Sequence, residues 1–117
     1  MRKHQQLRAW QESMELVSTI YALTATFPAE ERFGLSSQMQ RAAVSVPSNI
    51  AEGAARGSKA DFLRFLYIAR GSLSEVETQL LIAQRLGYLN DLSTTGPQLD
   101  SVFNLLGGLI KHLKLTS

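Results

Sequence analysis

Few side chains in this sequence could take part directly in covalent chemistry. The 117 residues include two histidines, ten carboxylates and no cysteine, which excludes disulfides, thiolate metal ligands and cysteine nucleophiles. His4 and His112 lie near opposite ends of the chain. Neither has a carboxylate or histidine at the helical spacing that a metal site or a Ser-His-Asp arrangement would use. We therefore expect no metal and no cofactor.

Three carboxylates remain as candidates for acid–base catalysis. Glu52, Glu75 and Glu77 could approach one another between two neighbouring helices, as paired catalytic carboxylates must. The preferred interpretation is structural: Glu52 pairs with Arg41 or Arg56, and Glu75 pairs with a neighbouring arginine. The sequence thus indicates a protein that is not an enzyme.

A line of polar side chains runs through the small-residue segment from Ser36 to Gly57. Its members follow one another at steps of three or four, so on a helix they lie above one another and form a polar ridge. Small neighbours such as Gly53 let another backbone approach closely. We expect the ridge, together with Gly53 and Glu75, to tie this helix to its neighbours or to an adjacent subunit. The ridge consists of Arg41, Ser45, Asn49, Glu52 and Arg56.

Apolar residues recur at helical spacing in four segments, and no strand pattern of comparable length competes with them. The expected helices run from about Gln6 to Phe27, from Leu35 or Ser36 to about Gly57, from Ser58 to about Gly87 and from about Gly96 to Leu115. The third carries a heptad seam. The seam consists of Phe62, Leu66, Ala69, Leu73, Val76, Leu80 and Ala83.

Local signals mark where these helices begin and end. Pro28 stops the first, Ser58 caps the third with Asp61 as its partner, and Gly87 ends the third. Capping-box spacing at Ser37 with Gln40 and at Thr95 with Gln98 predicts the starts of the second and fourth helices. Pro47 is expected to kink the second helix without breaking it.

Short connections between long helices favour antiparallel neighbours. We therefore expect one all-α domain over residues 1–117, an antiparallel up-down-up-down four-helix bundle. The basic start of the chain has no apolar segment behind it that would make a secretory signal. No apolar run approaches the roughly 20 residues of a membrane span. Together with the absence of cysteine, these features favour the cytoplasm and no membrane partner.

The third helix has more apolar surface than one bundle can cover. From Phe62 to Ala69 every residue except Arg64 is apolar, and a helix that is apolar on all sides must be buried on more than one side. We expect this segment to drive homo-oligomerisation; the alternative is a tolerated surface cluster. The predicted interface residues are Leu63, Phe65, Tyr67 and Ile68.

Charge is distributed unevenly between the two ends of the predicted bundle. The basic end (residues 1–8, 53–64 and 111–117) holds eight cations against Asp61 alone, whereas the acidic end (residues 28–36 and 86–97) has a net charge of −2. Phosphate backbones are the obvious ligand for such a cluster; the alternative is a solvated pair of chain ends. The eight residues are Arg2, Lys3, Arg8, Arg56, Lys59, Arg64, Lys111 and Lys114.

One long string of residues makes a family recognisable. Residues 41–53 read Arg-Ala-Ala-x-Ser-x-x-x-Asn-Ile-Ala-Glu-Gly, a specific pattern. The chain resembles the bacterial four-helix-bundle proteins encoded by intervening sequences inside 23S rRNA genes. Further matching residues are Phe27-Pro28, Glu31, Phe33-Gly34-Leu35, Gln38, Phe62, Leu66, Ala69, Gly71-Ser72-Leu73, Glu75, Glu77 and Gly87-Tyr88-Leu89.

The resemblance implies a homopentamer, and it does not imply an enzymatic activity. It also implies likeness to the accessory protein of diversity-generating retroelements, a basic pentameric bundle that binds nucleic acid and a reverse transcriptase. One departure is Gln40, where relatives often carry a basic residue. We therefore expect a non-catalytic homo-oligomer that binds nucleic acid through its basic end, with RNA as the favoured ligand. The alternative is a scaffold or adaptor for another protein.

Overall fold

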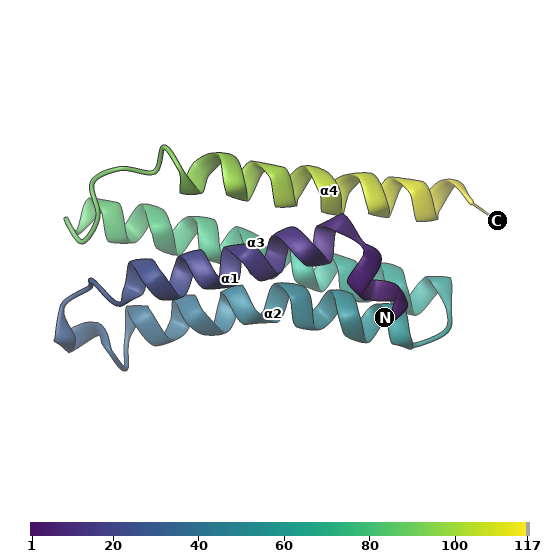
Figure 1. Cartoon of the computed structure of the whole chain (residues 1–117), viewed down its shortest axis with the longest axis horizontal. Coiled ribbons are helices and arrows are strands. Elements are labelled where there is room, and N and C mark those ends of the chain that lie inside the picture. The colour runs from purple at the N-terminus through teal and green to yellow at the C-terminus, as the bar shows by residue number, and fades with distance from the viewer. Residues whose placement is uncertain (117) are drawn as a thin grey trace.

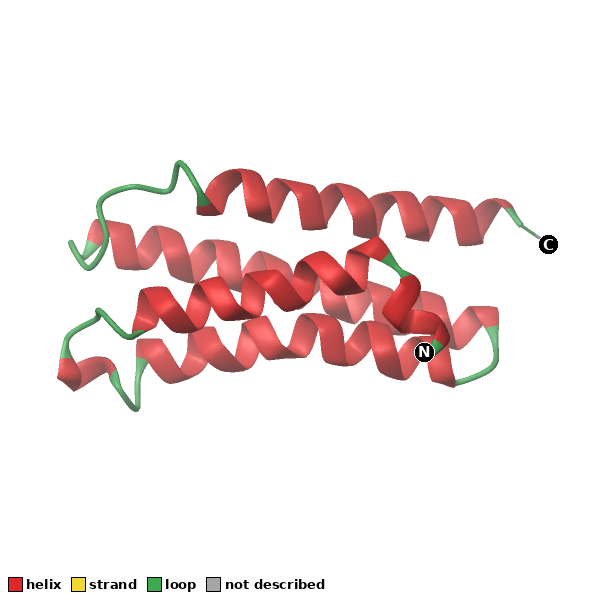
Figure 2. Cartoon of the chain, viewed as in Figure 1, coloured by secondary structure: helices red, strands yellow, loops and turns green. Residues whose placement is uncertain are grey.

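The computed structural model describes residues 1–116, and Ser117 lies outside the described residues. It contains four α-helices: α1 (Arg8–Thr24), α2 (Leu35–Ala55), α3 (Lys59–Arg85) and α4 (Thr95–Leu115). Two short 3₁₀ helices, η1 (Lys3–Gln6) and η2 (Ala29–Glu31), precede α1 and α2. Residues 1–116 contain no strand (Figure 2). The predictions of an all-α fold and of four helices are confirmed.

The four helices lie lengthwise beside one another in a body of 48 × 24 × 23 Å (Figure 1). Helix α2 packs against α1 and α3, and α4 closes the arrangement by contacting α1 and α3. The α1–α2 and α3–α4 connections lie at one end of the body. The α2–α3 turn and both chain termini lie toward the other (Figure 1). Residues distant in sequence therefore gather at each end.

The core follows the heptad seam of α3. Six of its seven predicted members are buried, and Phe62 is half-buried at the margin. Opposite them lie Leu16 and Ile20 of α1, Met39 and Ile50 of α2, and Leu106 of α4, all without exposed surface or nearly so. Burying a side chain of this size stabilises the fold by about 1.5–3 kcal/mol. The periodicity of α3 correctly identified the axis of the core.

Helix α1 is rotated relative to the simplest interpretation of its pattern. Its spacing gives two apolar stripes: the one through Leu16 and Ile20 is fully buried, whereas the other is only half-buried against the core, through Leu7, Trp10 and Val17. Met14 and Tyr21, which belong to the other stripe, are exposed. The small residue Ser13 is buried in their place and donates a hydrogen bond from its hydroxyl to the Trp10 carbonyl at 2.8 Å.

Helix ends follow some of the predicted signals and not others. The Ser58 hydroxyl accepts the backbone N–H of Asp61 at 3.1 Å, as expected. Gly87 has a φ of 81° and ends α3 through a Schellman pattern, in which Tyr88 N donates to the Ala83 carbonyl. Helix α2 continues through Pro47. Both predicted capping boxes are wrong, because the N-caps are Gly34 and Thr94, three residues and one residue before Ser37 and Thr95. The start of α2 at Leu35 is as predicted.

The start of α2 is capped from an unexpected place. Glu31 Oε1 accepts the backbone N–H of Leu35 at 3.1 Å, and Glu31 Oε2 accepts the Tyr88 hydroxyl at 2.7 Å. The rings of Phe27 and Tyr88 lie 5.4 Å apart. These contacts join the α1–α2 connection to the α3–α4 connection. The hydrogen bond from Tyr88 and then that from Leu35 lower the pKa of Glu31, and the same contact raises the pKa of Tyr88.

Candidate nucleic-acid interface

Three chain segments meet at the basic end. A small cavity of about 250 Å³ is lined by Lys3 of η1, Gly57 of the α2–α3 turn, Lys59 at the start of α3 and Leu113 near the end of α4. Lys59 Nζ also contacts the carbonyl of Thr116. Five of the eight predicted cations belong to these segments and are exposed: Arg2, Lys3, Lys59, Lys111 and Lys114.

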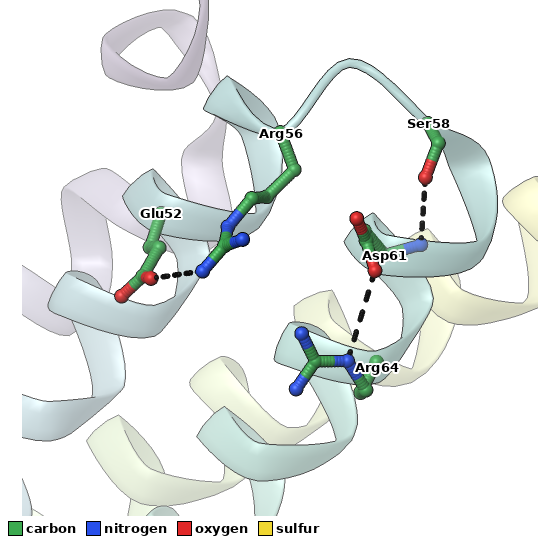
Figure 3. Close-up of polar contacts among 5 residues, drawn as sticks. All are labelled: Glu52, Arg56, Ser58, Asp61 and Arg64. Carbon is green, nitrogen blue, oxygen red and sulfur yellow. Dashed lines mark hydrogen bonds and ion pairs between the residues drawn. The ribbon is translucent and has the colours of Figure 1, made fainter.

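Two arginines share one aromatic ring at this end. The guanidinium groups of Arg56 and Arg64 lie 5.0 and 4.4 Å from the centre of the Phe65 ring, a distance at which cation and ring attract each other. Each arginine also has a local carboxylate, as Figure 3 shows: Arg56 donates to Glu52 at 2.8 Å, and Arg64 lies 3.7 Å from Asp61. About half of each arginine side chain stays exposed.

The turn between α2 and α3 positions these groups (Figure 3). Gly57 adopts a φ of 83°, which glycine accepts without strain, and Ser58 then caps α3. The cap fixes the first turn of α3, and Asp61 in that turn lies beside Arg64. One tight connection therefore brings Arg56 and Arg64 to the same ring of Phe65.

Arg8 does not join the other seven cations. It pairs with Glu12 at 2.8 Å, and Glu12 in turn accepts the hydroxyl of Ser101 in the first third of α4. Fourteen residues separate Ser101 from Leu115, roughly 21 Å of helix, while Arg8 is only about 6 Å from Glu12 along α1. Arg8 therefore lies well short of the end of α4.

The basic end keeps a positive excess after its ion pairs are counted. Without Arg8, its seven cations face two carboxylates, Glu52 and Asp61, which leaves an excess of five positive charges. Among residues 1–116, the remaining five cations are in no ion pair. Exposed ion pairs are also weak and are screened by salt. The paired arginines can therefore exchange their carboxylates for an external anion.

The polar ridge of α2 lies against α3. The hydroxyls of Ser45 and Ser72 are hydrogen-bonded at 2.9 Å, and Asn49 Nδ2 donates to the Ser45 hydroxyl and carbonyl, both at 2.8 Å. Next along the ridge, a Cβ on Gly53 would lie 2.7 Å from Phe65 Cβ. This part of the motif therefore holds α2 and α3 close together.

Two motif residues differ from expectation. Arg41 and Glu75 are exposed, and within residues 1–116 neither is in an ion pair. Glu52 uses Arg56 rather than Arg41. The expected pairing of Glu75 with an arginine of its own chain is therefore wrong. Arg41 does not tie α2 to its neighbours by an ion pair, because it lies on the outer side of the helix.

The predicted oligomer interface is only partly available. Phe65 is 6% exposed, because it packs at Gly53 beneath the two arginines, so its assignment to the interface is corrected. Leu63 is half-buried against the core. Tyr67 and Ile68 are 41% and 42% exposed. Sequence reasoning missed three further exposed apolar residues, although their positions outside the heptad seam could have revealed them: Leu81 and Ile82 on α3, and Leu86 at its C-cap.

Within residues 1–116, no group of three or more histidine, cysteine or carboxylate side chains could hold a metal ion. His4 lies edge-on against Trp10 with ring centres 5.3 Å apart. Within the same residues, no helix combines the length and hydrophobicity needed to cross a membrane.

These features define an all-α protein of four helices with one cationic end. The chain belongs to the 23S rRNA-intervening sequence protein family, whose model matches residues 5–108. A solved structure from Bacteroides thetaiotaomicron, described as a protein of unknown function from the S23 ribosomal protein family, is similar. It shares 27% identity and a TM-score of 0.63, over 90% of this chain and 94% of that one. No curated protein matches the chain.

Proposed function

We propose that this protein is a non-catalytic, cytoplasmic, homo-oligomeric bundle that binds nucleic acid, with RNA as the preferred ligand, through its basic end. The observation that supports this is the excess of positive charge on one end of the body. Neutralising each phosphate releases condensed counterions, which gives sequence-independent affinity. Five cations at this end are in no ion pair with residues 1–116, which suits that mode of binding.

Arg56 and Arg64 suit a role as preorganised phosphate ligands. A shared contact with Phe65 limits the conformations that both side chains sample, so less entropy is lost when they bind. Guanidinium groups also match phosphate oxygens in a bidentate geometry. The flexible lysines would add charge without fixed geometry.

We propose that each chain is an antiparallel up-down-up-down bundle. Copies of it associate through the outer face of α3. Five large apolar side chains are exposed along α3 and at its C-cap, more than the scattered single residues that an ordinary surface carries. They are Tyr67, Ile68, Leu81, Ile82 and Leu86. The family resemblance favours a pentamer. If the copies align side by side, their basic ends form one ring of cations.

Fluorescence anisotropy with a labelled ten-nucleotide RNA and the matching DNA tests the nucleic-acid proposal. The double variant Lys111→Glu with Lys114→Glu should weaken binding roughly 100-fold, because each reversal removes an attraction and adds a repulsion. Raising the salt concentration should weaken the unmodified protein steeply. Arg85→Glu is the matched control, since Arg85 lies in the last turn of α3 as Lys114 does in α4, and it should bind normally. An affinity for RNA that does not fall as the salt concentration rises would refute the proposal.

The second candidate is an adaptor that recognises another protein. The exposed apolar face of α3 favours it, because such faces mark protein contacts as readily as self-contacts. A nuclease-treated pull-down with the full chain distinguishes the two candidates. Partners retained after all nucleic acid is removed, combined with no direct RNA binding, would favour the adaptor.

A further inference from the structure

A groove lies on the surface of α1 and α2, beside the connection between these two helices, whose place in the fold Figure 1 shows. It consists of two adjoining cavities of about 690 and 450 Å³. The first is bordered by Phe27, Phe33 and Arg32, and the second by Tyr21 and Val44. Ser37, Gln40 and Arg41 line both, so the two cavities form one groove.

The charge in this groove is all of one sign. No aspartate or glutamate is among its lining residues, whereas Arg32 and Arg41 are. Within residues 1–116 neither arginine is in an ion pair. The neighbouring carboxylate of Glu31 already accepts hydrogen bonds from Tyr88 and Leu35. The groove therefore offers two arginines to an external anion.

The rest of the lining combines exposed apolar groups with an ordered polar contact. Phe33 is 89% exposed, and the guanidinium of Arg32 lies 5.5 Å from the centre of its ring. Tyr21 and Val44 expose apolar surface at the other end of the groove. Between them Gln40 Nε2 donates to the Thr24 hydroxyl at 2.9 Å and joins α2 to α1. An occupant would meet aromatic, aliphatic and cationic groups together.

The groove has the dimensions of a short peptide. Ser36 and Ser45 mark its ends on α2, nine residues or roughly 14 Å apart. An extended segment of about four or five residues covers that length at roughly 3.3 Å per residue. A nucleic-acid strand fits less well, because it carries a charge at every phosphate and some of these would lie beside the exposed Glu30, next to the lining residue Ala29. A peptide can carry its carboxylates beside the two arginines alone.

We propose that this groove binds an acidic peptide segment of a partner protein, one that carries an aromatic or leucine side chain beside its carboxylates. Arg41 and Arg32 bind the carboxylates in the geometry that guanidinium groups favour. Phe33, Tyr21 and Val44 contact the apolar side chain. This site is separate from the basic end, so peptide binding can be tested independently of nucleic-acid binding.

Selection from a displayed library of random heptapeptides against the full chain tests the proposal. The expected result is enrichment of peptides that combine at least two aspartates or glutamates with an aromatic residue or leucine. Synthetic copies of the selected peptides should bind the Arg41→Gln variant roughly 10- to 100-fold more weakly, the effect of losing one charged hydrogen-bonding group. Arg85→Gln, an exposed arginine on α3, is the matched control and should bind them normally.

Three outcomes would overturn the proposal. The first is a selection without enrichment, or with enrichment of peptides that lack acidic residues. The second is equal binding of the selected peptides by Arg41→Gln and by the unmodified protein. The third is displacement of those peptides by a ten-nucleotide RNA in the unmodified protein and in the Lys111→Glu, Lys114→Glu variant alike. That result would assign the groove to nucleic acid. Circular dichroism of each variant checks that the helices are intact.

Discussion

The two ends of the molecule use their polar groups in opposite ways. At the acidic end, Glu31 binds Tyr88, 57 positions away, and also caps α2. At the basic end, the ion pairs join residues only three or four apart, and five cations are in no ion pair within residues 1–116. One end uses its charge to close the fold. The other leaves its charge available for a ligand.

Close backbone packing, rather than charge, stabilises the basic end, and the substitution Gly53→Ala tests this. A Cβ at this position would lie 2.7 Å from Phe65 Cβ and 3.1 Å from a carbon of the Phe62 ring. We expect a loss of about 1–3 kcal/mol in the free energy of unfolding, the usual cost of overpacking. Urea denaturation measures it. Gly71→Ala is the control, since a Cβ there meets nothing within 4 Å, and it should stabilise α3 slightly.

A polar contact stabilises the acidic end, and Tyr88→Phe should reveal it through pH. The Tyr88 and Leu35 hydrogen bonds lower the pKa of Glu31 below its ordinary value of 4.5. A lowered pKa contributes stability that is present above pH 4.5 and is lost as the pH falls through the folded value. The variant should therefore be less stable at pH 7, and the difference should shrink toward pH 3. A difference that persists unchanged at pH 3 would show that packing, not charge, dominates.

The same contact predicts a second change at high pH. The pKa of Tyr88 is raised above 10.0 by its hydrogen bond to Glu31. A raised pKa means that stability is present below pH 10 and is lost as the pH rises through the folded value. Thermal melts above pH 10 should therefore show a decline in the unmodified protein that Tyr88→Phe lacks. An identical decline in both would assign it to other groups.

The smallest expected change in stability is at Arg64. Its ion pair with Asp61 is long, at 3.7 Å, and exposed, and its contact with the Phe65 ring is half-exposed, so Arg64→Gln should lower the free energy of unfolding by no more than about 1 kcal/mol. The same variant should weaken RNA binding several-fold if the basic end is the interface. Urea denaturation and anisotropy on one sample separate the two effects. A large loss of stability would show that a charged side chain stabilises the basic end too, and that the two ends do not differ in this respect.

Local patterns in the sequence predicted the axis of the fold well. The heptad seam of α3, the Ser58 cap and the Gly87 stop each depend on residues within a few turns of one another, and the structure has all three. The contact of Glu31 with Tyr88 could not be derived this way, because no local spacing relates residues so far apart. Its participants were visible only as parts of a family resemblance.

The segment from Phe62 to Ala69 shows where pattern alone fails. Nearly every residue in it is apolar, so periodicity could not tell which side faces the core. Phe65 became buried because Gly53 lets α3 approach α2 closely, and two arginines cover its ring. The sequence did not reveal that Arg41 is exposed for a related reason. The spacing that defines the polar ridge does not decide which of its members lie between helices and which face outward.

The position of the chain termini has a practical consequence for any experiment on this protein. Both lie toward the α2–α3 turn (Figure 1). An affinity tag or a fluorescent protein fused to either terminus would therefore lie close to the proposed RNA-binding surface. A histidine tag there would add its own attraction for phosphate, while a bulky domain would block access. A reporter inserted in the α3–α4 connection, at the far end of the body, avoids both effects.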